Sequence, residues 1–76
     1  MTEIEWINSF ADNLTMIMYE SKLTQKDLSE MTGISEGTIS KYLRRQQMPG
    51  IKAALNISYA LSCSLDDLLD FGERID

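Results

Sequence analysis

A short junction in the middle of the chain most constrains its fold. Residues 23–45 read LTQKDLSEMTGISEGTISKYLRR, two helix-like runs that meet at Gly33. Gly33 can adopt the left-handed conformation that ends a helix without steric cost. Ser35 can then accept a hydrogen bond from the first free N–H groups of a new helix. Such a turn sets two helices at roughly 90–120°, so the second protrudes while the first braces it.

Hydrophobic periodicity extends the helical pattern over the rest of the chain. Apolar residues recur at spacings of three and four, and no stretch alternates with period two long enough to predict a strand. Thr2 with Glu5, and Thr24 with Asp27, have the spacing of a capping box. The sequence predicts an all-α, compact bundle of five short helices containing a helix-turn-helix, at about 4–20, 24–32, 36–44, 51–61 and 64–71. We expect a single domain over 1–71 and a frayed tail over 72–76.

The same periodicity predicts which side chains face the core. The first helix should bury one stripe, the second and third a few apolar residues each, and the fourth a single side. In chain order these are Ile7, Phe10, Ala11, Leu14, Ile17, Met18, Leu28, Met31, Ile39, Tyr42, Leu43, Ile51, Ala54, Leu55, Ser58 and Leu61.

The net charge of −5 hides an uneven distribution along the chain. Residues 22–52 hold six of the seven basic residues against three acidic ones, a net charge of +3, whereas residues 1–21 and 53–76 each carry −4. A binding partner interacts mainly with charges within a Debye length, roughly 8–10 Å at physiological salt, and not with the net charge of the whole chain. The middle segment is therefore where an anionic partner is expected.

Composition disfavours several classes of function. No run approaches the ~18 apolar residues of a membrane span, and the acidic start MTEIEW lacks the basic region of a signal peptide. Lone Cys63 is expected as a small buried residue in a reducing cytoplasm. There is no histidine and no cluster at metal-ligand spacing. We therefore expect no enzyme activity, metal, cofactor, small-molecule ligand or membrane partner.

The outward face of the third predicted helix points to nucleic acid. At about 100° per residue, Ile39 and Tyr42 turn inward while Gly37, Lys41 and Arg44 face outward. A small, polar, basic helix face fits the B-DNA major groove, about 12 Å wide. Each signal is also common in an ordinary helical bundle with a basic surface, which remains the alternative.

A longer set of residues carries a family resemblance. The chain has Leu23-Thr24-Gln25, Leu28, Gly33-Ile34-Ser35 and Ile39-Ser40, and later Pro49, Ile51, Leu55, Ile57, Ala60, Leu61, Ser64, Asp67, Leu68 and Leu69. From Leu14 to Leu69 it resembles the lambda-repressor/Cro-like helix-turn-helix family, also called XRE-like. About three quarters of the chain follow the family pattern at matching spacings.

The resemblance implies a set of DNA contacts. Base edges would be read by Glu36, Gly37, Ser40 and Lys41. The DNA backbone would be met by Thr24, Gln25, Lys26, Ser35, Thr38, Arg44, Arg45 and Gln47. Two alternatives stay open: Gln25 as a solvated amide without a role, and Glu36 as an acid that stabilises its own helix N-terminus instead of accepting from cytosine N4.

The chain departs from the family pattern at several positions. Lys22 stands in place of a Gly after the first helix, which predicts a changed turn. Leu43 replaces a frequent Glu, and Arg45 replaces a Gly, which predicts a longer third helix and a more basic loop. Gly50 replaces the usual Ser cap of the fourth helix, a modest loss.

The resemblance implies a cytoplasmic, sequence-specific transcriptional regulator, a small repressor of the phage or mobile-element type without an effector domain. We expect a homodimer on a palindromic double-stranded DNA operator. The alternatives are an antitoxin with the same fold, and a protein-interaction module that has lost DNA binding. The dimer contact could use Ile4, Trp6 and Met16, or Phe71 and Ile75, but these side chains could equally lie in the monomer's own core.

Overall fold

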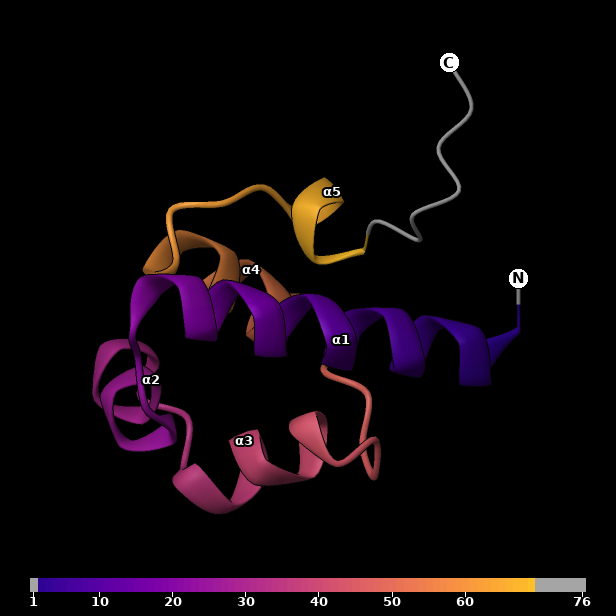
Figure 1. Cartoon of the computed structure of the whole chain (residues 1–76). Coiled ribbons are helices and arrows are strands. Elements are labelled where there is room, and N and C mark those ends of the chain that lie inside the picture. The colour runs from indigo at the N-terminus through magenta and orange to yellow at the C-terminus, as the bar shows by residue number, and fades with distance from the viewer. Residues whose placement is uncertain (1, 70–76) are drawn as a thin grey trace.

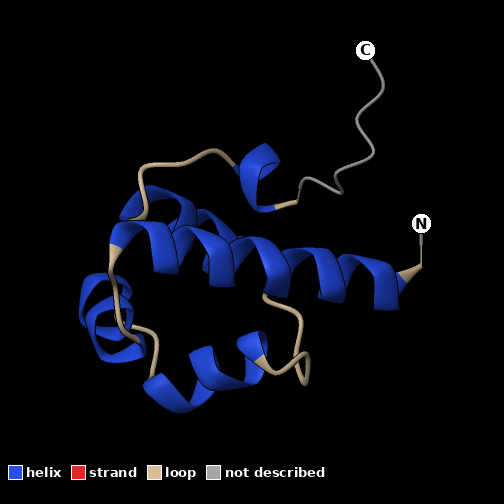
Figure 2. Cartoon of the chain, in the orientation of Figure 1, coloured by secondary structure: helices blue, strands red, loops and turns tan. Residues whose placement is uncertain are grey.

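The computed structural model describes residues 2–69, which form five helices and no strand (Figure 2). The helices are α1 (Glu3–Ser21), α2 (Gln25–Thr32), α3 (Glu36–Leu43), α4 (Ile51–Ala60) and α5 (Leu65–Leu68). In Figure 1, α3 lies below α1 and α5 lies above it. Helix α1 packs against α3 and α5, and α2 packs against α3 and α4. The all-α helix-turn-helix fold predicted from the sequence is confirmed.

Local capping residues set where the helices begin. Thr2 and Glu5 form a capping box at α1, as do Thr24 with Asp27 at α2 and Ser64 with Asp67 at α5. Each box satisfies two backbone N–H groups that have no partner inside the helix. The predicted helix starts are thereby confirmed to within a residue.

The helix ends hold two corrections. Lys22 adopts the left-handed conformation of the expected glycine (φ 59°), and its N–H donates to the carbonyl oxygens of Met18 and Tyr19. The predicted change of turn is therefore wrong. Helix α3 ends at Leu43, and Arg45 also takes a left-handed conformation (φ 62°), so the longer third helix is wrong as well.

Helix α5 ends at Leu68, short of the predicted residue 71. Residues 70 and 71 of the predicted helix, and the predicted frayed tail 72–76, lie outside the described residues.

The core gathers one or more apolar side chains from every helix. Phe10 of α1 and Tyr42 of α3 meet edge to face, with ring centroids 6.0 Å apart. Between α1 and α5, the Asn13 side chain donates a hydrogen bond of 2.8 Å to the Leu68 carbonyl oxygen. The buried apolar residues are Phe10, Ala11, Leu14, Met18, Leu28, Ile39, Tyr42, Ala54, Ile57 and Leu68.

The predicted core is wrong at three positions. Met31, Ile51 and Leu55 are 49%, 68% and 38% exposed. Helix α4 buries Ala54 and Ser58 as predicted, and with them Ile57, because its partners α2 and α5 cover that side. Ile7, Ile17, Leu43 and Leu61 are half-buried at the edge of the core.

Candidate nucleic-acid interface

The turn between α2 and α3 is closed by its own backbone. Gly33 has φ 79°, in the left-handed region, and its N–H donates to the Ser29 carbonyl oxygen at 2.8 Å. Ser35 follows in an extended conformation and caps α3 through its side chain. The structure thus confirms the glycine exit and the serine cap predicted for a helix-turn-helix.

A second set of hydrogen bonds, all of which involve Thr32, stabilises this turn. The Thr32 hydroxyl donates to the Leu28 carbonyl oxygen at 2.8 Å and accepts from the Ile34 N–H at 3.1 Å. The side-chain amide of Asn56, on α4, donates to the Thr32 carbonyl oxygen at 2.6 Å. Helix α4 therefore fixes the end of α2, and so the direction in which α3 leaves. Sequence reasoning missed Asn56, because this contact joins residues far apart in the chain.

Helix α3 is anchored on one side and open on the other. Ile39 and Tyr42 are buried. The four predicted base-reading residues share the outward side: Glu36, Gly37 and Lys41 are exposed, and Ser40 is half-exposed. The helix thus presents a small, polar surface that no other described element covers. Glu36 is exposed in the first turn of α3, where an acidic side chain is favoured by the helix dipole.

Gly37 leaves unused space on this face. A Cβ atom built on Gly37 would meet only the Ser35 hydroxyl oxygen, 4.0 Å away. The protein's own packing therefore does not require glycine here, and an alanine would fit in the free chain.

A short hydroxyl chain begins at the cap of α3. The Ser35 hydroxyl accepts from the Thr38 N–H at 3.1 Å and donates to the Thr38 hydroxyl oxygen at 2.9 Å. The Thr38 hydroxyl thus accepts one hydrogen bond and keeps its own hydrogen to donate. An outward-lying anionic oxygen is a suitable acceptor for it.

The other predicted backbone contacts flank the face of α3. Thr24, Gln25 and Lys26 are exposed at the start of α2, and Thr24 and Gln25 border a hollow of about 300 Å³. Hydrogen bonds from the Thr24 N–H and hydroxyl lower the pKa of Asp27 beside them. Arg44 and Gln47 are exposed after α3. These side chains are free of protein cover, as a phosphate contact requires.

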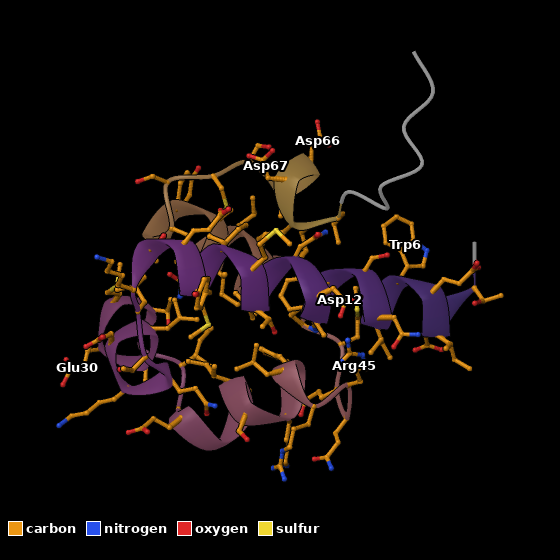
Figure 3. All side chains as sticks on the ribbon, in the orientation of Figure 1. Trp6, Asp12, Glu30, Arg45, Asp66 and Asp67 are labelled. Carbon is orange, nitrogen blue, oxygen red and sulfur yellow. The ribbon has the colours of Figure 1, made fainter. Side chains whose placement is uncertain are left out.

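Arg45 is arranged differently from the other predicted contacts. Its guanidinium forms an ion pair with Asp12 of α1 (Figure 3). It also donates to the Asn8 side-chain oxygen at 2.9 Å. Nothing in the sequence pointed to Asn8 or Asp12 beyond an arginine at a position where glycine is usual. We therefore leave Arg45 out of the proposed phosphate contacts.

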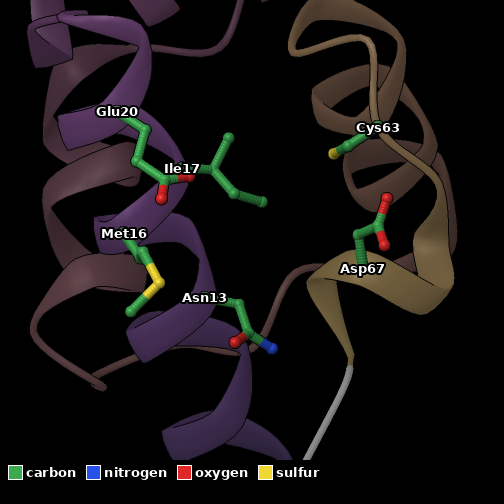
Figure 4. A pocket seen from close by; sticks show the side chains of 6 residues that line it. All are labelled: Asn13, Met16, Ile17, Glu20, Cys63 and Asp67. Atoms are coloured by element: carbon green, nitrogen blue, oxygen red, sulfur yellow. The ribbon is translucent and has the colours of Figure 1, made fainter.

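A hollow of about 410 Å³ lies between α1 and α5, away from α3 (Figure 4). Cys63 lies in its wall opposite Ile17, with Asp67 nearby. Burial, and then the negative charge of Asp67, raise the pKa of the Cys63 thiol. The thiol is therefore kept protonated and is a poor nucleophile.

Within residues 2–69, no group of three or more Cys, Asp or Glu side chains is placed to hold a metal ion. In the same part of the chain, no helix has both the length and the apolar character needed to cross a bilayer.

The family assignment follows from the sequence comparison. A family model for the Cro/C1-type HTH DNA-binding domain matches residues 13–73, most of the chain. The chain belongs to this family, and the lambda-repressor/Cro-like resemblance is confirmed.

One curated relative is YqaE of Bacillus subtilis strain 168, named as an uncharacterized HTH-type transcriptional regulator. This chain is 35% identical to it over 60 residues, which cover 79% of this chain and 52% of the relative. The chain thus spans about half the length of that relative. No solved structure matches the chain significantly.

Proposed function

We propose that the protein is a sequence-specific transcriptional regulator that reads the major groove of double-stranded DNA with α3. One observation carries this proposal: α3 is held from behind by Ile39 and Tyr42, while its outward face is polar and uncovered. An anchored helix of this kind can enter a groove without disturbing the core. The proposed base-reading residues are Glu36, Gly37, Ser40 and Lys41.

Phosphate contacts would supply most of the affinity. Exposed cations release counterions from the duplex when they bind, so affinity falls steeply with salt. Hydroxyl and amide groups at the two helix N-termini would fix the register. The proposed backbone contacts are Thr24, Gln25, Lys26, Ser35, Thr38, Arg44 and Gln47.

We further propose that the protein is a small cytoplasmic repressor of the phage or mobile-element type, and that it acts as a homodimer on a palindromic operator. One short helix reaches too few base pairs for high affinity, and two-fold pairing doubles the contacts. Exposed apolar side chains support a protein contact near the start of α1 and of α4: Ile4 is 70% exposed and Ile51 68%. Met16, at 61% exposed, is also outside the core. Trp6 is half-buried, whereas Phe71 and Ile75 lie outside the described residues.

Selection of bound sequences from a random duplex pool tests this function. The proposal predicts a recovered consensus with two inverted half-sites about one helical turn apart. A consensus without symmetry would contradict the dimer, and failure to enrich any sequence would contradict sequence-specific binding.

The same preparation separates the two alternatives. An interaction module that has lost DNA binding would show no salt-dependent affinity for any duplex. An antitoxin would bind its operator and also co-purify with the product of a neighbouring gene.

A further inference from the structure

The second residue of the loop after α3, Arg45, is an arginine in a conformation that favours glycine. Arg45 has φ 62°, and its N–H donates to the Tyr42 carbonyl oxygen at 3.2 Å. The next residue, Gln46, donates its N–H to the Lys41 carbonyl oxygen at 2.8 Å. For a residue with a Cβ atom, the left-handed conformation is unfavourable because the Cβ atom comes too close to the following carbonyl oxygen. A glycine would avoid this cost. The presence of an arginine here therefore indicates that its side chain has a role.

Two nitrogen atoms of the Arg45 guanidinium contact side chains of α1. Its Nε donates to Asn8 Oδ1 at 2.9 Å, and its Nη2 pairs with Asp12 Oδ1. Its Nη1 lies 3.5 Å from the Leu43 carbonyl oxygen. Asn8 and Asp12 are four residues apart, so they share one face of α1. The side chain thus spans from the loop to α1, where Figure 3 shows Arg45 beside Asp12.

We propose that Asn8 and Asp12 are positioning residues for DNA binding. Through Arg45 they fix the loop of residues 44–47 against α1, so that Arg44 and Gln47 are presented to phosphates while Arg45 makes no phosphate contact. This inference rests on the proposed function. A loop ordered before binding loses less conformational freedom in the complex, and affinity rises for every DNA sequence alike.

The expected effect is modest, because the pair is partly in solvent. The side chains of Arg45 and Asp12 are 42% and 67% exposed, and such pairs contribute little to stability. We expect losing the contact to weaken DNA binding about two- to five-fold, the range that corresponds to an exposed pair.

A competing arrangement makes the opposite prediction. If Arg45 left Asp12 for a phosphate on binding, Asp12 would be a competitor of the DNA. Removing Asp12 would then tighten binding. Removing Arg45 would lower the slope of log affinity against log salt concentration by about 0.9, the value of one phosphate contact.

The test compares Asp12→Ala, Arg45→Ala and the double variant with the unmodified chain, by anisotropy titration of a labelled duplex over a range of salt. We expect each single variant to weaken binding to all duplexes about two- to five-fold. The double variant should be no weaker than either single one, since both break the same contact. The salt slope of Arg45→Ala should stay within about 0.3 of the unmodified value, well below one phosphate contact.

Two controls separate the contact from charge and from backbone strain. Glu20→Ala removes an exposed acid from the same helix and should not weaken binding, since less negative charge favours DNA. Arg45→Gly removes the side chain and places a residue at position 45 that adopts positive φ without strain. It should weaken DNA binding as much as Arg45→Ala does, and circular dichroism should show that the variant is folded.

Tighter binding by Asp12→Ala, or a slope lower by about 0.9 in Arg45→Ala, overturns the inference and leaves the proposed function standing. An unmodified chain without salt-dependent DNA binding overturns both.

Discussion

Asn56 on α4 donates a 2.6 Å hydrogen bond to the backbone carbonyl oxygen of Thr32, the last residue of α2. The carbonyl groups in the last turn of a helix have no partner inside that helix. Asn56 supplies one here, and it thereby links α4 to the turn that sets the direction of α3.

Replacing Asn56 with alanine tests this link. Asn56→Ala leaves a half-buried carbonyl group unpaired, and we expect the free energy of unfolding to fall by about 1–2 kcal/mol. Urea denaturation followed by circular dichroism measures it. Lys52→Ala, at an exposed position of the same helix, is the matched control and should change little. If Asn56→Ala lowers the free energy of unfolding no more than Lys52→Ala does, the hydrogen bond from Asn56 to Thr32 does not stabilise the fold.

Gly37→Ala should change stability and DNA binding in opposite directions. The added methyl group has room in the free protein, and alanine is favoured over glycine in a helix by up to about 1 kcal/mol. Thermal unfolding should therefore move to higher temperature. At the DNA surface the methyl group would meet base edges, and we expect affinity for the selected duplex to fall about tenfold. Unchanged DNA affinity would mean that position 37 lies outside the contact.

Ser62→Gly should stabilise the protein without changing the proposed DNA-binding face. Ser62 follows α4 with φ 54°, a conformation that glycine adopts without the Cβ penalty. After the greater freedom of glycine in the unfolded chain is subtracted, we expect a gain of about 0.5–1 kcal/mol. Urea denaturation measures this gain, and anisotropy titration should show unchanged DNA affinity. A destabilised variant would show that the serine hydroxyl contributes a contact larger than the backbone cost.

Acid should weaken the start of α2 through Asp27. The backbone and side-chain hydrogen bonds of Thr24 lower the pKa of Asp27 below its ordinary value of 3.8. A carboxyl group whose pKa is lowered in the folded state stabilises the fold at pH values above its unfolded-state pKa. This stabilisation is lost as the pH falls through its folded-state pKa. We expect Asp27→Asn to flatten the fall of unfolding free energy with pH below about 3.8. A curve parallel to that of the unmodified chain would contradict this role, with Glu30→Gln on the same helix as the control.

The sequence was most informative where structure is decided locally. The caps at Thr24 and Ser35 and the glycine exit at Gly33 each involve partners within four residues, so spacing alone predicts them. The outward face of α3 was predicted for the same reason, because burying Ile39 and Tyr42 forces Gly37 and Lys41 outward.

Features that depend on distant partners were not predictable in this way. The apolar residues of α4 allow more than one buried side, and only the positions of α2 and α5 select Ile57 for burial beside Ala54 while leaving Ile51 exposed. The contact between Arg45 and Asp12 joins residues 33 apart in sequence. Local propensity also failed at Lys22, where closing the turn outweighs the preference for glycine.

The most direct test of the central claim is the ratio of affinities for the selected duplex and a scrambled duplex, measured for the unmodified chain, Lys41→Ala and Arg44→Ala. We expect Arg44→Ala to weaken both duplexes equally, as the loss of a phosphate contact should, and Lys41→Ala to reduce the ratio itself by about five-fold or more, as the loss of a base contact should. A ratio near one for the unmodified chain, or a ratio that neither substitution changes, would contradict the reading of DNA by α3.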